Sequence, residues 1–149
     1  VAPSHQRFLG MGSGNGGVVS SVSASSILGG DVPSRVYDGN PNRPGDWHST
    51  GGDTQGWVKI DFSTPQKISR IKFYNRNDCC QLMLGGNLQG WTGSSWTNIA
   101  SLSMSNSSSS TDTSNTSDAT TAWNSIRIKS NSSNGGYVSI GEIELFKFV

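Results

Sequence analysis

The stretch WVKIDFSTPQKISRIKFYN, residues 57–75, decides the fold class because apolar and polar residues alternate through both of its halves. In the first half, Val58, Ile60 and Phe62 fall on one face of an extended chain, and the second half repeats the pattern around Phe73. The STPQ between them is typical of a turn. The stretch therefore predicts two half-buried β-strands joined by a short connection.

Four further segments have strand character. They are VVSSVSASS (18–26), GGNLQGWTGSSWTNIASL (85–102), AWNSIRIKS (122–130) and GYVSIGEIELFKF (136–148). The second contains turn residues in its middle and reads as a hairpin, and the last reads as one long strand. No segment predicts a helix longer than a turn. Short strands with turn-rich joins indicate an all-β protein, a sandwich or jelly roll.

The remaining segments are rich in small polar residues. Residues 1–17 end in GMGSGNGG and are expected to be a flexible lead-in to a single domain over 18–149. Residues 29–54 contain many Gly, Pro, Asp and Asn, which predicts a long loop region, and long ordered loops are usually functional. Residues 103–121 are Ser/Thr/Asn-rich and are expected to be exposed and weakly structured.

The composition narrows the classes of partner. The 149 residues are 32% hydrophobic and 14% charged, with a formal net charge of +1, so there is no basic field for nucleic acid and no polybasic membrane patch. Five Trp argue against disorder, and a neutral polar surface suits neutral partners such as sugars. No apolar run approaches the roughly 20 residues that span a bilayer. The start at Val1 indicates a mature or excised piece of a longer protein.

The sequence contains only weak candidates for catalytic residues. His48 has Asp46 and Asp53 nearby in sequence but no nucleophile motif beside it, so a loop histidine is the expected reading. Glu142 and Glu144 lie two apart on a predicted strand, with side chains roughly 6 to 7 Å apart. Glycosidase carboxylates usually come from separate elements, so these residues do not predict an enzyme.

Two short motifs leave alternatives open. In RVYDGNPN, Asp38 and Asn40 flank a glycine, which suits either oxygen ligands for a hard cation or a turn that its own side chains stabilise.

The second motif is YNRNDCC, residues 74–80. Arg76 and Asp78 point the same way on an extended chain and form either a braced arginine suited to sugar hydroxyls or a surface ion pair. Cys79 and Cys80 form either a stiff apolar knuckle through a disulfide or two buried thiols.

Taken together, SASSILGG, YDGNPN, WHS, GWVKIDF, ISRIKFYNRNDCC and SIGEIELF resemble the discoidin, or coagulation factor C-type, superfamily over residues 18–148. Within it, NRNDCC (75–80) is similar to the fucose-binding F-type lectins, and the DWHS loop (46–49) resembles galactose-binding modules. The resemblance implies an eight-stranded antiparallel β-sandwich that binds sugars without catalysis and holds a structural calcium.

The resemblance also implies site residues. For the metal, it implies the side chains and carbonyls of Arg35, Asp38, Asn40, Ser49, Gly141 and Glu142. For the sugar, it implies His48, Arg76, Asp78, Cys79, Cys80 and Trp47, with a vicinal disulfide against the sugar ring.

The sequence departs from the lectin pattern at two polar positions. Met83 stands where the family has a second arginine, and Gly51 and Gly52 stand where it has its histidine. Losing a charged hydrogen bond costs about 1.5–3 kcal/mol, so the sugar class stays open between fucose and galactose types.

The sequence thus predicts a lectin-like module with calcium, outside the cell or on a cell or virion surface, as part of a larger or oligomeric protein. Its expected partners are glycans, with no nucleic acid and no membrane insertion. The alternative is an adhesion or structural domain of a surface or virion protein with a degenerate sugar site.

Overall fold

The computed structural model describes residues 3–12, 17–40, 45–76, 82–107 and 110–149, which form eleven strands and one short 3-10 helix, η1. In chain order they are β1 (His5–Leu9), β2 (Val19–Ala24), η1 (Pro33–Tyr37), β3 (Trp47–His48), β4 (Trp57–Lys67), β5 (Arg70–Tyr74), β6 (Met83–Trp91), β7 (Trp96–Ser103), β8 (Thr111–Asn115), β9 (Ala122–Ser133), β10 (Ser139–Ile140) and β11 (Glu142–Phe148).

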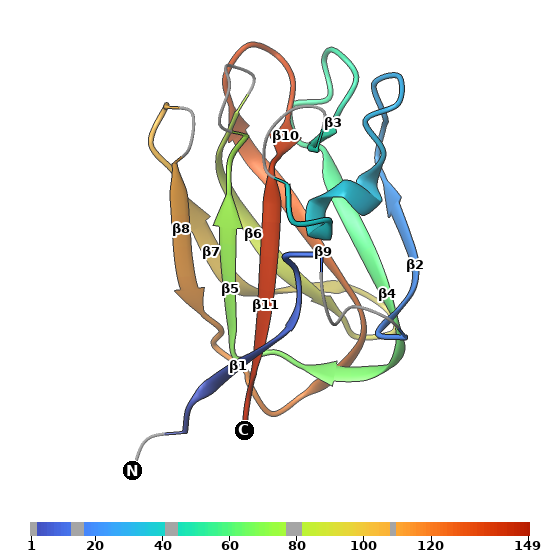
Figure 1. Ribbon diagram of the computed structural model, residues 1–149, viewed down its shortest axis with the longest axis vertical. Helices are drawn as coiled ribbons and strands as arrows, with labels where there is room; N and C mark the ends of the chain where they lie inside the picture. The colour runs from blue at the N-terminus through green and yellow to red at the C-terminus, as the bar shows by residue number, and fades with distance from the viewer. Residues whose placement is uncertain (1–2, 13–16, 41–44, 77–81, 108–109) are drawn as a thin grey trace.

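The strands form two antiparallel sheets that pack face to face (Figure 1). One sheet has the order β1-β11-β5-β8 and the other β2-β4-β9-β6-β7, while β10 and β3 pair as a small ribbon at one end. This confirms the predicted all-β sandwich. The described part of the chain has more strands than the eight expected because several of them are only two to five residues long.

The alternation that predicted the fold builds the core. Val58, Ile60 and Phe73 have no exposed surface, and Phe62 is 6% exposed. Their polar neighbours on the same strands, such as Lys59, lie on the outer faces. The apolar face of each strand is thus buried between the two sheets, which is the main source of stability in such a sandwich.

Two segments expected to lack structure belong to the first sheet. The lead-in contributes β1, which pairs with β11 from His5 opposite Phe148 to Leu9 opposite Leu145. The low-complexity segment contributes β8, which pairs with β5. The expected lack of regular structure was wrong for both strands, because strand pairing uses backbone N–H and C=O groups and an edge strand needs few apolar side chains. The expected exposure holds for β8, whose residues alternate between exposed and half-buried.

The end of the sandwich that carries β3, β10 and η1 lies opposite both chain termini (Figure 1). The predicted single strand over 136–148 is divided there into β10 and β11, with Gly141 between them. The Gly141 N–H donates to the Tyr74 carbonyl at 2.9 Å, so the chain passes directly from the ribbon into the sheet. Within the described residues, no helix is long and apolar enough to cross a membrane.

Replacing Phe73 tests this register. Phe73→Ala removes a fully buried ring and is expected to lower the free energy of unfolding by about 3–5 kcal/mol in urea titrations. Lys72→Ala on the neighbouring, outward position is the control, and it should change stability by less than about 1 kcal/mol, although Lys72 lies over the Tyr74 ring. Equal losses in the two variants would contradict the inward position of Phe73, and a larger loss in Lys72→Ala would mean that β5 has the opposite register.

Candidate functional site

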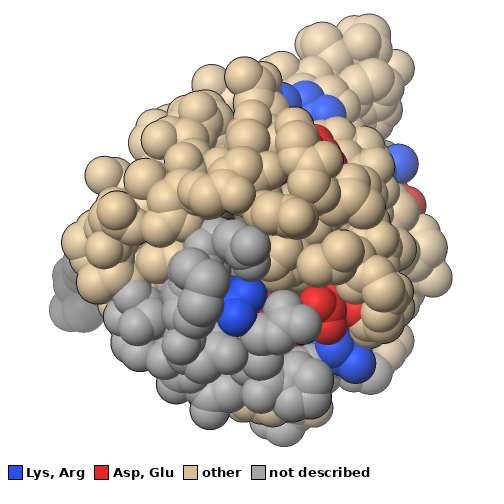
Figure 2. All heavy atoms as spheres, turned by 90° about the horizontal axis from the view of Figure 1, so that it is seen from above, with Lys and Arg blue, Asp and Glu red and all other residues tan. Residues whose placement is uncertain are grey.

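The loop end gathers acidic and basic side chains into a small area. Figure 2 looks down on this end and shows acidic and basic side chains close together, beside the residues that are not described. The residues come from the end of β5, from the segment before β3 and from the start of β11.

Arg76 and Asp46 form a buried charged pair here. Arg76 Nη1 lies 4.0 Å from Asp46 Oδ2, and the two side chains are only 5% and 0% exposed. Asn75, the preceding residue, donates to the Met83 carbonyl at 3.0 Å and thereby fixes the chain just after β5. An arginine held in this way presents its donors with little loss of side-chain entropy, as recognition of hydroxyl or carboxylate oxygens requires.

His48 lies in the same end but is almost fully buried, at 1% exposure. Its Nδ1 lies 2.7 Å from the Ser49 carbonyl, and its ring packs edge-on against Tyr137 with centroids 5.3 Å apart. A carbonyl oxygen only accepts, so Nδ1 carries the proton and Nε2 of a neutral ring is an acceptor. In this tautomer Nε2 of His48 can accept a hydrogen bond but cannot donate one.

Trp47 does not lie where the sequence placed it. Its ring is completely buried in the core, and its indole N–H donates to the Ser26 carbonyl at 3.0 Å. The expected stacking of Trp47 on the apolar face of a sugar is corrected to a packing role. The physical reason is the pairing of β3 with β10, which points this side chain between the sheets.

A second cluster surrounds Glu142 at the start of β11. The fully buried carboxylate accepts hydrogen bonds from the backbone N–H groups of Met11, at 2.6 Å, and Gly39, at 3.1 Å. Asp38 lies close enough to share a hydrogen bond with it. Burial raises the pKa of Glu142 to about 8; the two backbone donors oppose the rise and the nearby Asp38 adds to it. Partial burial also raises the pKa of Asp38.

The structure brings only part of the predicted metal set together. Asp38 and Glu142 are in contact, and Asn40 is in the same turn, since its N–H donates to Asp38 Oδ1 at 2.8 Å. The Arg35 carbonyl accepts the N–H of Asp38 at 3.4 Å. The fully buried Ser49 instead accepts the Val138 N–H with its Oγ at 2.8 Å, in the ribbon. In the described ranges, no group of three or more His, Cys, Asp or Glu side chains is placed to hold a metal ion.

The structure thus places the acidic side chains of Asp38 and Glu142 side by side. Burial is the largest cause of the raised pKa of Glu142, and the neighbouring Asp38 adds to it, because two acidic groups in one buried position disfavour one another's charge. Calcium accepts carboxylate, carbonyl and hydroxyl oxygens together, and the DGN turn is rich in them.

Three predicted sugar-site residues, Asp78, Cys79 and Cys80, lie outside the described residues, so the predicted brace and disulfide stay predictions. Met83, at the position of the family's second arginine, is described and is fully buried. That position therefore offers no side-chain donor to a ligand.

Sequence reasoning missed two parts of this end. Asp46 was noted only as a neighbour of His48, yet it is the acidic partner of Arg76; its place at the head of DWHS was the available signal. The GMG turn, residues 10–12, crosses over the DGN turn so closely that a side chain at Gly12 would come within 2.6 Å of the Asp38 carbonyl. Met11 accordingly has a positive φ of 59°.

Comparison with known proteins gives a family match. The profile of the F5/8 type C domain matches residues 21–143, which includes both clusters except the GMG turn. A comparison with curated proteins found no match.

Solved structures share the fold at low sequence identity. The family 32 carbohydrate-binding module of Clostridium perfringens NanJ, in complex with galactose, has a TM-score of 0.73 and 21% identity over 85% of this chain and 93% of its own. Chitosan-binding module 1 of a Paenibacillus sp. IK-5 chitosanase/glucanase has a TM-score of 0.67 and 19% identity over 87% and 96%. Truncated AlyQ, with CBM32 and alginate lyase domains, has a TM-score of 0.69 and 18% identity; the match covers 99% of this chain and 34% of that protein.

Gly141 offers a test of how the site is positioned. An added Cβ at this residue would lie 2.8 Å from the Asn75 carbonyl oxygen and 2.9 Å from the Arg76 nitrogen, so Gly141→Ala must push the backbone that carries Arg76. We expect a loss of about 1–3 kcal/mol in the free energy of unfolding, measured by denaturant titration.

Gly30→Ala is the matched control, because an added Cβ there meets nothing within 4 Å. It should leave stability within about 1 kcal/mol of the parent protein. A Gly141→Ala protein as stable as the Gly30→Ala protein would contradict the close approach of β11 to Arg76.

Proposed function

Because the chain belongs to the F5/8 type C domain family, we propose that it is a non-catalytic carbohydrate-binding module whose loop end recognises a galactose- or fucose-type sugar. The observation that carries the proposal is the buried Arg76–Asp46 pair at the end where the loops converge. A sugar presents hydroxyl edges and an apolar C–H face, and a fixed guanidinium is well suited to the edges.

The two buried polar side chains have complementary roles in this proposal. Arg76 donates to ring or hydroxyl oxygens, and His48 Nε2 accepts from a hydroxyl while its Nδ1–H is held by the Ser49 carbonyl. Asp78 and the Cys79–Cys80 pair are proposed to complete the site, the cysteines as the apolar floor for the sugar ring.

Two neighbours favour the galactose type over the fucose type. The NanJ module was determined with galactose, and a further Clostridium perfringens module, CpGH89CBM32-5, with GalNAc-β-1,3-galactose. The buried Met83 also argues against the fucose type, because it replaces a donor that the fucose-binding pattern uses.

The same loss of a donor supports the alternative, in which the domain is an adhesion or structural module with a degenerate sugar site.

The glutamates of β11 are engaged in structural contacts. Glu142 holds the two turns, and Glu144 pairs with Arg7 at 3.1 Å and accepts a hydrogen bond from the Tyr74 hydroxyl. These contacts give both glutamates a structural role in the described part of the chain.

We place the module outside the cell, on glycans of a cell or matrix surface, as part of a larger or oligomeric protein. Single sugar sites of this kind are weak, and several copies on one particle bind far more tightly than one. AlyQ, which combines such a module with a lyase domain, is a precedent for the arrangement.

Calcium is proposed as a structural ion of this end. Asp38 and Glu142 would supply carboxylate oxygens, and Asn40, Ser49 and the carbonyls near Arg35 and Gly141 would supply neutral ones. The ion's charge would offset the repulsion between the two acids and fix the DGN turn against β11.

Arg76→Lys tests the sugar site while keeping a positive charge beside Asp46. Lysine lacks the planar fork, so we expect binding to a galactose-terminated glycan array, displayed as a multimer, to fall by about tenfold or more. Arg70→Ala is the control and should bind normally, because Arg70 is a half-buried residue of β5 whose Nε donates to Asn115. No binding to any glycan by the parent multimer, with calcium present, would favour the structural alternative instead.

Thermal unfolding with added calcium tests the ion. Binding to the folded state raises stability by about 2.7 kcal/mol when the ion is at 100 times its Kd, so the Tm should rise with calcium and return after EGTA. Asp38→Asn should abolish the rise, and Asp118→Asn, an acid in the turn before β9, should retain it. A Tm that does not respond to calcium in the parent protein would leave Glu142 as a purely structural acid.

A further inference from the structure

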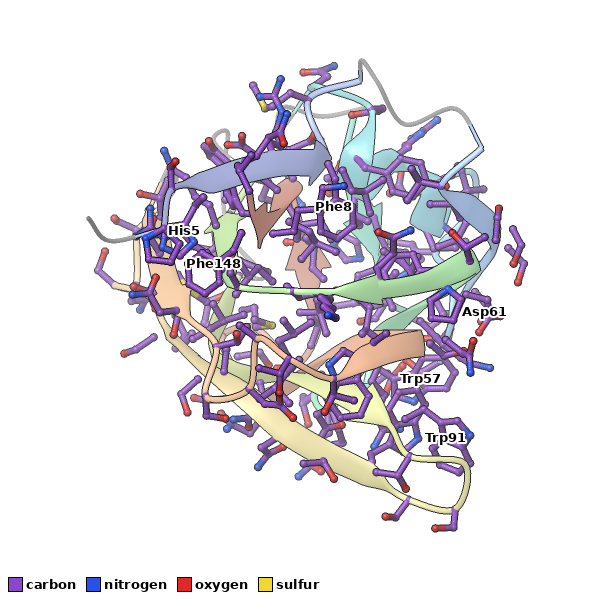
Figure 3. The ribbon with its side chains drawn as sticks, turned by 90° about the horizontal axis from the view of Figure 1, so that it is seen from below. His5, Phe8, Trp57, Asp61, Trp91 and Phe148 are labelled. Atoms are coloured by element: carbon purple, nitrogen blue, oxygen red, sulfur yellow. The ribbon has the colours of Figure 1, made fainter. Side chains whose placement is uncertain are left out.

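The outer face of the five-stranded sheet carries a second concave surface, away from the loop end. Its hollow has a volume of about 400 Å³, within the range of ligand pockets. It is lined by Trp57 and Lys59 of β4, Trp91 of β6, Trp96 of β7, and Ser125 and Arg127 of β9. In Figure 3 Trp57 and Trp91 lie next to each other on this side of the molecule.

Strand alternation explains why three tryptophans face outward. Val58 and Ile60 point into the core, so Trp57 and Lys59 must point out. Trp91 lies opposite Trp96 at the end of the β6–β7 hairpin, with ring centroids 5.1 Å apart. All three indoles are only half-buried. Aromatic rings grouped on an outer face are typical of a binding surface.

A second hollow extends the surface along the hairpin. It has a volume of about 620 Å³, shares Trp91 with the first, and is lined in addition by Thr92, Gly93 and the segment 121–124. Trp123, one of its lining residues, is 5% exposed, and its indole N–H has no hydrogen-bond partner in the described part of the chain. A buried donor of this kind is costly unless a ligand or water accepts from it.

The charges on this face are predominantly positive. Lys59 lies directly opposite Arg127 in the sheet, an arrangement of like charges that is destabilising by itself. Asp61 pairs with Lys59 at 3.4 Å, which leaves Arg127 without an acid among its described contacts.

Arg127 is nevertheless held in place. Its guanidinium lies 4.5 Å from the Trp96 ring centroid, and its Nε donates to Gln89 at 2.6 Å. Those contacts use one of its five N–H donors, so the others remain for an acceptor such as a carboxylate.

We propose that this face is a second glycan site, which binds an acidic sugar chain with a uronate carboxylate on Arg127 and sugar C–H faces on Trp57 and Trp91. A pyranose has an apolar face for the indoles and hydroxyl groups that can donate to Ser125 Oγ, whose own hydroxyl hydrogen goes to Asp61. The two joined hollows suit successive units of one chain, whereas a protein partner would need about 800 Å² of matching surface. The site shares no residue with the loop end and does not depend on its function.

Titration with oligogalacturonate, followed by tryptophan fluorescence and calorimetry, tests the proposal. The neutral, carboxyl-reduced oligomer of the same length is the matched ligand. The parent protein should bind the acidic oligomer about tenfold or more tightly than the neutral one, and this preference should shrink as salt is added.

Variants separate this site from the loop end. Arg127→Gln should remove the preference for the acidic oligomer, and Trp91→Ala should weaken both oligomers, while Ser101→Ala, an exposed position on β7, should bind like the parent. Arg76→Lys should not affect this binding. Equal affinity for the two oligomers, unchanged binding in Arg127→Gln, or no binding of the acidic oligomer would overturn the proposal, and Arg127→Gln keeps the test valid if Trp91→Ala is too unstable.

Discussion

The carboxylate of Glu142 is the contact on which the loop end depends. It is buried at the start of β11, the strand between β1 and β5, and it accepts the N–H groups of Met11 and Gly39. One side chain thus joins the last strand to two turns that are far away in sequence. A buried carboxylate requires compensation, and here it comes from backbone donors and, in our proposal, from a cation. Because Gly141 lies directly before it, the same short segment also determines where Arg76 lies.

The sequence predicted the parts of the fold that depend on side-chain alternation. The strands around Ile60 and Phe73 follow from apolar residues at every second position, and the structure confirms them. The strands β1 and β8 could not be found this way, because their pairing with β11 and β5 satisfies backbone groups and demands few apolar side chains. Their sequences are close to those of ordinary polar loops.

The candidate site was predictable in its location and less so in its contacts. Arg76, His48 and the Asp38–Glu142 pair all lie at the loop end, as motifs from separate segments suggested. Trp47 was misplaced, because a tryptophan in a polar loop sequence gives no sign that β3 pairs with β10 and points the ring inward. Asp46 was overlooked as the partner of Arg76, since the pairing joins residues thirty positions apart and only the fold brings them together.

The two arginines illustrate how burial determines what a charged side chain contributes. The Arg76 side chain is 5% exposed and lies beside Asp46. Folding has therefore already removed its guanidinium from water, and a ligand forms directional hydrogen bonds with a pair that has no net charge. Arg127 is half-exposed, stacked on Trp96 and without a neighbouring acid among its described contacts, so an anionic ligand gains charge attraction as well. In our proposals, the first arrangement would select neutral sugars by geometry and the second would select acidic sugars by charge. The loops and the outer sheet face thus place the same kind of side chain in different surroundings, and this difference is the physical basis of both proposals.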